Sequence, residues 1–158
     1  MNKVEVSVLV HNIRSTHNVG SIFRTGDALG VGKIYLSGYS PTPLDKYDRP
    51  RKDVAKVALG AEKTVSWQYF EKPDKLIKKL KKEGFEIVGL EQSKNSIDYK
   101  KFKPKKKILF IVGSEVSGVD SKILNLCDKI VEISMKGKKE SLNVSVAFGV
   151  ALFRILNI

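Results

Sequence analysis

The chain has 158 residues, enough for one domain with a substantial core, and its formal net charge is +12. Such a charge favours a polyanionic partner, either nucleic acid or an anionic membrane surface. The single cysteine, Cys127, excludes an intramolecular disulfide and a multi-cysteine metal site, and no apolar run approaches the ~20 residues of a membrane-spanning helix. These two observations lead us to expect neither a metal nor a membrane partner. Because the N-terminus lacks a signal-peptide pattern, we also expect a cytoplasmic protein.

The first half of the chain alternates strand and helix patterns. Residues 4–10 (VEVSVLV) predict a strand, and residues 18–30 predict a helix that stops at Gly30. A second strand follows at 33–38, and three prolines within 40–53 indicate an exposed loop. The pattern then predicts a short helix at 54–62, an extended piece at 64–70 and a lysine-rich helix at 73–84.

The second half continues in the same way. Strands are predicted at 85–90, 107–113 and 129–134, with a helix at 119–127 and a final helix from Asn143. Regular alternation favours a mostly parallel sheet with helices on both faces, so we expect one α/β domain over residues 1–158. Cys127 fits the buried face of its helix, and His11 and His17 are expected to be polar residues of the first loop.

Polar clusters follow three of the predicted strands, at residues 12–25, 113–118 (GSEVSG) and 134–143 (SMKGKKESLN). In open α/β sheets, ligands bind beyond the carboxyl ends of the strands. GSEVSG lacks the spacing of both a P-loop and a dinucleotide fold, and Glu115 would repel phosphate. A tight turn in which Glu115 caps the next helix is the structural alternative. The clusters therefore indicate a ligand other than a polyphosphate.

Together the clusters resemble the three motifs of the SpoU/TrmH family of RNA ribose 2′-O-methyltransferases, within the SPOUT superfamily. NVGSIFRT is similar to the first motif, ILFIVGSEVSGVD to the second and IVEISMKGKKESLNVSVA to the third. The resemblance implies methyl transfer from S-adenosylmethionine to a ribose 2′-hydroxyl of tRNA or rRNA, and a C-terminal deep trefoil knot. Ser134 and Thr16 stand where the family often has proline, but neither change removes a reactive group.

The resemblance also assigns roles to residues. Arg24 would act on the ribose hydroxyl, and because arginine keeps its proton, we expect it to clamp phosphate and the developing alkoxide. Asn18 and Asn143 would position Arg24 and the nucleotide, and Glu115 would orient them, with Ser141 also at the catalytic centre. Structural alternatives are that Asn18 only caps the first helix, that Ser141 or Asn143 caps the last, and that Arg24 is a surface side chain. The implied cofactor-binding residues are Leu90, Gly113, Ile133, Met135, Ser141 and Leu142.

Partners follow from charge and from the last helix. We expect Arg14, Arg24, Arg49 and Arg51 to bind RNA, and the lysines of 73–84 to be a solvated face. The helix from Asn143 is apolar over more than the ~100° that packing on a sheet requires, so a second copy should cover it in a homodimer. With no RNA-binding extension expected, substrate choice would fall to this core and its partner subunit.

Two other functions stay open from the sequence. One is a catalytically idle RNA-binding module of the same fold, although the intact set of asparagines, arginine and glutamate speaks against it. The other is a base methyltransferase of guanine-N1 type, against which the Asn18-to-Arg24 spacing and the Ser-Leu-Asn triplet favour ribose.

Overall fold

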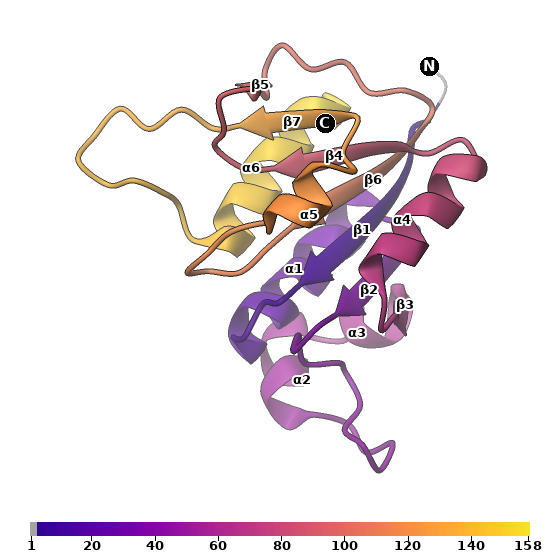
Figure 1. The fold of residues 1–158 in the computed structure, drawn as a ribbon. Helices are drawn as coiled ribbons and strands as arrows, with labels where there is room; N and C mark the ends of the chain where they lie inside the picture. The colour runs from indigo at the N-terminus through magenta and orange to yellow at the C-terminus, as the bar shows by residue number, and fades with distance from the viewer. Residues whose placement is uncertain (1–2) are drawn as a thin grey trace.

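The computed structural model describes residues 3–158 and is built on a sheet of seven parallel strands (Figure 1). The strand order is β3-β2-β1-β6-β4-β7-β5. Their bounds are β1 Glu5–His11, β2 Lys33–Ser37, β3 Ser66–Tyr69, β4 Glu86–Leu90, β5 Ile97–Asp98, β6 Lys107–Val112 and β7 Lys129–Glu132. The chain runs from β1 outward through β2 to β3, and the four later strands all lie on the other side of β1, so the strand order reverses between β1 and β6.

Helices cover both faces of the sheet, as the alternating pattern predicted. Along β6, Phe110 packs in one core with α1 and α6, whereas Leu109 and Ile111 pack in a second core with α4 and α5. Alternate side chains of a strand point to opposite faces, so a strand buried on both sides is apolar at every position. The helices are α1 Thr16–Leu29, α2 Lys52–Ala58, α3 Ala61–Thr64, α4 Pro73–Lys82, α5 Ser121–Leu124 and α6 Val144–Leu156.

Local signals explain where the long helices begin and end. The Ser15 hydroxyl accepts a hydrogen bond from the Asn18 backbone N–H, so Ser15 caps α1, and Gly30 ends it in the left-handed conformation with φ of 69°. Asn18 is therefore not the cap, which leaves its side chain free for other contacts. Asn143 caps α6, because its Oδ1 accepts from the N–H groups of Ser145 and Val146 at 3.0 and 3.4 Å.

Several expectations were wrong in detail. The single helix expected at 54–62 is two helices, α2 and α3, because Leu59 and Gly60 between them take the left-handed conformation. His17 lies in the first turn of α1 and not in a loop. The two-residue strand β5 was not predicted, since two residues carry no period, and α5 is a single turn rather than nine residues. His11 is not a loop residue: it ends β1, is buried, and its Nδ1 lies 2.7 Å from the Ser37 hydroxyl. Burial lowers the pKa of His11, although Asp120 beside its Nε2 opposes the shift.

Cys127 belongs to the core, as predicted. It packs with the second apolar cluster, and burial raises the pKa of its thiol to about 12, far above that of a reactive thiolate. Among residues 3–158 no helix is long and apolar enough to cross a membrane, and no group of three or more His, Cys, Asp or Glu side chains could hold a metal ion.

Candidate active site

A cavity of about 530 Å³ opens where β4, β6 and β7 end. It is lined by four segments: the end of β4 and its loop, the loop after β6, the residues after β7, and the start of α6. The structure brings together on this wall all six residues that the resemblance assigned to the cofactor, which are Leu90, Gly113, Ile133, Met135, Ser141 and Leu142.

Only glycine fits at position 113, because the backbone of the same loop occupies the space that a side chain would need. A Cβ there would come within 2.6 Å of the Gly118 carbonyl carbon and the Val119 nitrogen, which no real contact tolerates. The close approach lets Ser114 and Gly118 exchange two backbone hydrogen bonds, at 3.0 and 2.8 Å. The glycines of GSEVSG thus shape a rigid turn at the cavity.

Glu91 and Gln92 also line the cavity, and the sequence analysis did not select them. One carboxylate oxygen of Glu91 accepts from the Val119 backbone N–H at 3.0 Å, and the Gln92 side-chain amide donates to the Glu140 carbonyl at 2.7 Å. These bonds tie the loop after β4 to the loops that carry the second and third motifs. A polar pair directly after a buried strand was the signal that could have found them.

A chain of side-chain hydrogen bonds joins the three motifs. The Asn143 amide donates to Asn18 Oδ1 at 3.1 Å, and the Asn18 amide donates in turn to Glu115 Oε1 at 3.0 Å. These residues are separated by up to 125 positions in sequence. Because Asn143 also caps α6, one side chain both starts the helix and orients Asn18.

Glu115 is held by backbone groups as well. Its two carboxylate oxygens accept from the N–H groups of Arg14 and Ser15, each at 3.1 Å, at the entrance to α1. Partial burial favours the neutral acid, but the bonds from Asn18, Ser15 and Arg14 outweigh it and lower the pKa of Glu115. The alternative that Glu115 caps the next helix is wrong, because Asp120 caps α5.

The charged residues of the cavity wall are acidic, although the chain as a whole is basic. Glu91, Glu115 and Glu132 line it, whereas lysine and arginine are absent from the described residues of its wall. Carboxylates disfavour a polyphosphate and favour a cation. The lining therefore suits a ligand that is apolar in part and positively charged in part.

Arg24 lies apart from this cavity. It is exposed on α1, six residues after Asn18, which puts it about 120° around the helix from Asn18. In the described part of the chain its side chain has no hydrogen-bond or ion-pair partner, so the expected contact with Asn18 and Asn143 is not present. Its neighbour Thr25 packs near Gly149 of α6, which locates Arg24 beside the α1–α6 contact.

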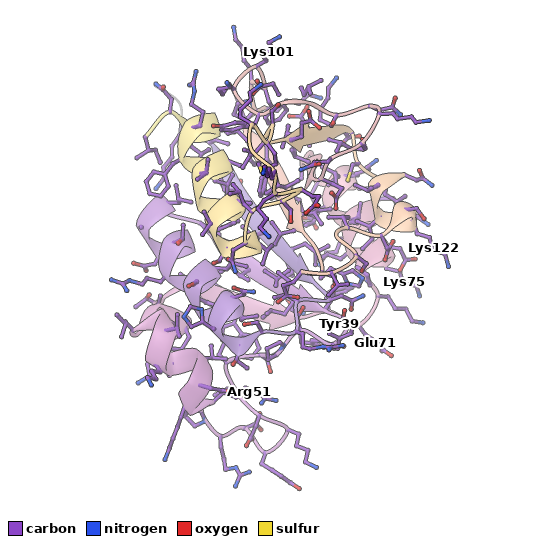
Figure 2. The ribbon with its side chains drawn as sticks, turned by 90° about the vertical axis from the view of Figure 1, so that its left-hand side faces the viewer. Tyr39, Arg51, Glu71, Lys75, Lys101 and Lys122 are labelled. Atoms are coloured by element: carbon purple, nitrogen blue, oxygen red, sulfur yellow. The ribbon has the colours of Figure 1, made fainter. Side chains whose placement is uncertain are left out.

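The other arginines predicted to bind RNA have different settings. The exposed guanidinium of Arg14 lies 5.9 Å from the centre of the Tyr39 ring. Arg49 is paired with Asp45 at 2.9 Å, and Arg51 is half-buried with a buried Nε that lacks a partner among residues 3–158. Arg51 and Lys101 lie toward opposite ends of the molecule (Figure 2), so the lysines around Phe102 are remote from the arginine loop.

Several known proteins are similar to this chain in sequence and in fold. A tRNA (guanosine(18)-2′-O)-methyltransferase of Aquifex aeolicus is 33% identical over 94% of this chain and 67% of its own length. Relatives from Staphylococcus aureus are 30% identical, and the chain spans 57% of their length. The chain thus corresponds to between about half and two thirds of these relatives.

Solved structures of SpoU/TrmH enzymes and other RNA methyltransferases have the same fold as this chain. The crystal structure of an Aquifex aeolicus TrmH/SpoU tRNA modifying enzyme superposes with a TM-score of 0.85 at 30% identity, covering 99% of this chain and 77% of that one. An AdoMet-bound rRNA methyltransferase from Sinorhizobium meliloti has the same fold, with a TM-score of 0.86 at 23% identity over 97% of this chain and 56% of that one. The model of the SpoU rRNA Methylase family matches residues 5–153, and the chain therefore belongs to that family.

Proposed function

We propose that this protein transfers a methyl group from S-adenosylmethionine to a ribose 2′-hydroxyl of tRNA or rRNA. The observation that carries the proposal is the convergence of the six residues assigned to the cofactor, five of them from the motifs, on one cavity beside the Asn143–Asn18–Glu115 network. The name of the Aquifex aeolicus relative, a tRNA 2′-O-methyltransferase, supports the same reaction.

The cavity fits the proposed cofactor in size and character. About 530 Å³ lies within the range of small-molecule sites, and its apolar residues suit an adenine ring. S-adenosylmethionine supplies a methyl group activated by a positive sulfonium, which the three glutamates of the wall favour over a phosphate. Leu90, Ile133, Met135 and Leu142 would hold the apolar part, and Gly113 and Ser141 the polar part.

The chain's own residues would handle the RNA. The ribose hydroxyl is a weak nucleophile at neutral pH, so its oxygen must be held in line and its developing charge stabilised. We assign that stabilisation to the Arg24 guanidinium, which stays protonated and would also hold an adjacent phosphate. Asn18, Asn143 and Glu115 would fix the nucleotide's position, because their hydrogen bonds connect the cavity with the start of α1. Ser141, which lines the cavity, would assist them.

Two alternatives are less well supported. An idle RNA-binding module would have no need for a network that joins three motifs, and the network here is intact. A guanine-N1 methyltransferase is not favoured by the relative's name, which specifies a 2′-O product.

We further propose that two copies pair through α6. Val146, Val150 and Phe153 lie at helical spacing and are 50%, 41% and 36% exposed, so α6 carries an exposed apolar stripe in addition to its buried face. Thr25, the neighbour of Arg24, packs near Gly149 of α6, so pairing through α6 would bring Arg24 toward a second copy. The second copy would also bring its own RNA-binding surface next to that of the first.

The remaining assignments follow the family resemblance. We propose a single domain over residues 1–158 and a deep trefoil knot formed by the segment after β7, which swings out from the sheet before it returns as α6 (Figure 1). Gln92, which ties the loop after β4 to Glu140, supports a threaded arrangement. Arg14, Arg49 and Arg51 are proposed RNA contacts, and a cytoplasmic location stays a prediction.

The Arg24→Ala variant tests the proposed methyl-transfer activity and the role of Arg24 in it. Methyl transfer from tritiated S-adenosylmethionine to total RNA should fall to background, while calorimetry should show unchanged cofactor affinity, because Arg24 does not line the cavity. Arg24→Lys should restore little, since an ammonium cannot reproduce a planar, forked donor. If well-folded wild-type protein binds neither S-adenosylmethionine nor its demethylated product, the proposed function is wrong.

A further inference from the structure

The side chain of Tyr39 is an aromatic ring left on the surface, 54% exposed, two residues after β2 ends. The Arg14 guanidinium carbon lies 5.9 Å from the ring centre, within the range of a cation–π contact. Figure 2 shows Tyr39 at the edge of the molecule, well away from Lys101.

The backbone under this ring is fixed by several bonds. The Tyr39 N–H donates to Asn12 Oδ1 at 3.3 Å, and the buried Ser40 hydroxyl joins Ile13 to Val10 through two bonds of 3.0 Å. The Tyr69 hydroxyl donates to the Gly38 carbonyl at 3.0 Å. The loops after β1 and β2 are therefore one rigid unit, and a preorganised ring binds at lower entropic cost.

Arg14 connects this ring to the cavity wall. Its side chain lies over Tyr39, and its backbone N–H donates to Glu115, which lines the cavity and accepts from Asn18. Tyr39 itself does not line the cavity. Arg14 is thus the single residue that links the ring to Glu115 of the cavity wall.

We propose that Tyr39, braced by Arg14, stacks on an unpaired base of the RNA next to the methylated nucleotide. This inference rests on the proposed function. Aromatic rings bind unpaired bases whatever their sequence, because every base has a π-face, and arginine beside the ring attracts the backbone phosphates. Arg14 covers one face of the ring, and the exposed face receives the base.

Tyr47 offers a matched control. It is 64% exposed, and Lys46 and Arg49 lie 5.0 and 4.9 Å from its ring. Its backbone N–H bonds only within its own turn, to Asp45. The two tyrosines therefore share exposure and neighbouring cations, but only Tyr39 is tied to the Glu115 network.

The experiment measures binding of a fluorescein-labelled single-stranded oligoadenylate of 12 residues and of a fully paired RNA hairpin, by anisotropy. Tyr39→Ala should weaken single-strand binding by about 5- to 150-fold, the usual effect of losing one base–aromatic stack, and leave hairpin binding unchanged. Tyr39→Phe should bind like the wild type, because the ring is retained, and Tyr47→Ala should change binding less than about twofold. Unchanged S-adenosylmethionine affinity of Tyr39→Ala shows that the fold is intact.

Several results would overturn the proposal. These are equal weakening for the hairpin and the single strand, a Tyr39→Phe variant as weak as Tyr39→Ala, an equal effect of Tyr47→Ala, or no binding of the single strand by wild-type protein. Its failure is separable from that of the enzyme: Tyr39-dependent binding without methyl transfer would support stacking and refute the methyltransferase. Conversely, methyl transfer together with single-strand binding that is unchanged in Tyr39→Ala would support the methyltransferase and refute the stacking.

Discussion

Replacing Gly113 with alanine adds one methyl group at a position of the cavity wall where the neighbouring atoms are backbone. The new Cβ would lie 2.6 Å from the Gly118 carbonyl carbon and from the Val119 nitrogen, whereas ordinary contacts begin at 3.4 Å. The loop must therefore move by nearly 1 Å, and both atoms belong to backbone that cannot rotate away as a side chain does. Such overpacking costs about 1–3 kcal/mol.

The displacement also strains the two backbone hydrogen bonds between Ser114 and Gly118. Each contributes about 1 kcal/mol, so we expect Gly113→Ala to lower the free energy of unfolding by roughly 2–4 kcal/mol in urea titrations. Calorimetry should show S-adenosylmethionine affinity reduced by at least about tenfold, because this loop forms one wall of the cavity.

Gly137 provides the matched control for this substitution. It lies in the loop of the third motif, and a Cβ there would meet no atom within 4 Å. Gly137→Ala should leave both the unfolding free energy and the cofactor affinity within about 0.5 kcal/mol of wild type. A Gly113→Ala variant that resembles Gly137→Ala in both measurements would refute the reasoning about the loop.

Three further predictions address charge and assembly. The lowered pKa of Glu115 means that its ionised form stabilises the native state above its ordinary value of 4.5, and this contribution is lost as pH falls through the lowered native value. The stability difference between wild type and Glu115→Gln should therefore be larger at pH 7 than at pH 3, and an equal difference would contradict the network. Phe153→Asp should yield monomers in sedimentation at micromolar concentration, whereas Leu59→Asp, at the exposed residue that follows α2, should not; an active wild-type monomer would exclude the dimer. RNA affinity should fall with salt with a log–log slope of about −0.7 to −0.9 per phosphate contacted, and Arg51→Ala should reduce that slope while Lys101→Ala, at the other end, should not.

Much of the fold could be predicted because its signals are local. Valine-rich strands, the glycine that ends α1 and the proline that opens α4 depend on neighbours a few residues apart. The errors occurred where local signals fail. Strand β5 is too short to have a period, α5 ends after one turn despite a longer helical pattern, and His11 is buried by contacts with Ser37 and Asp120.

The sequence by itself determined the order of strands and helices, the polar loops after them and the residues that resemble the family's motifs. Only the tertiary structure decided that Asn143 bonds to Asn18, that Asn18 bonds to Glu115 and that Glu115 receives two N–H groups from the entrance of α1. It also decided that Arg24 does not line the cavity and that Tyr39 lies under Arg14. Spacing along the chain encodes which face of an element a residue occupies, but contacts across 100 residues depend on strand order, and strand order is set by the packing of the whole sheet.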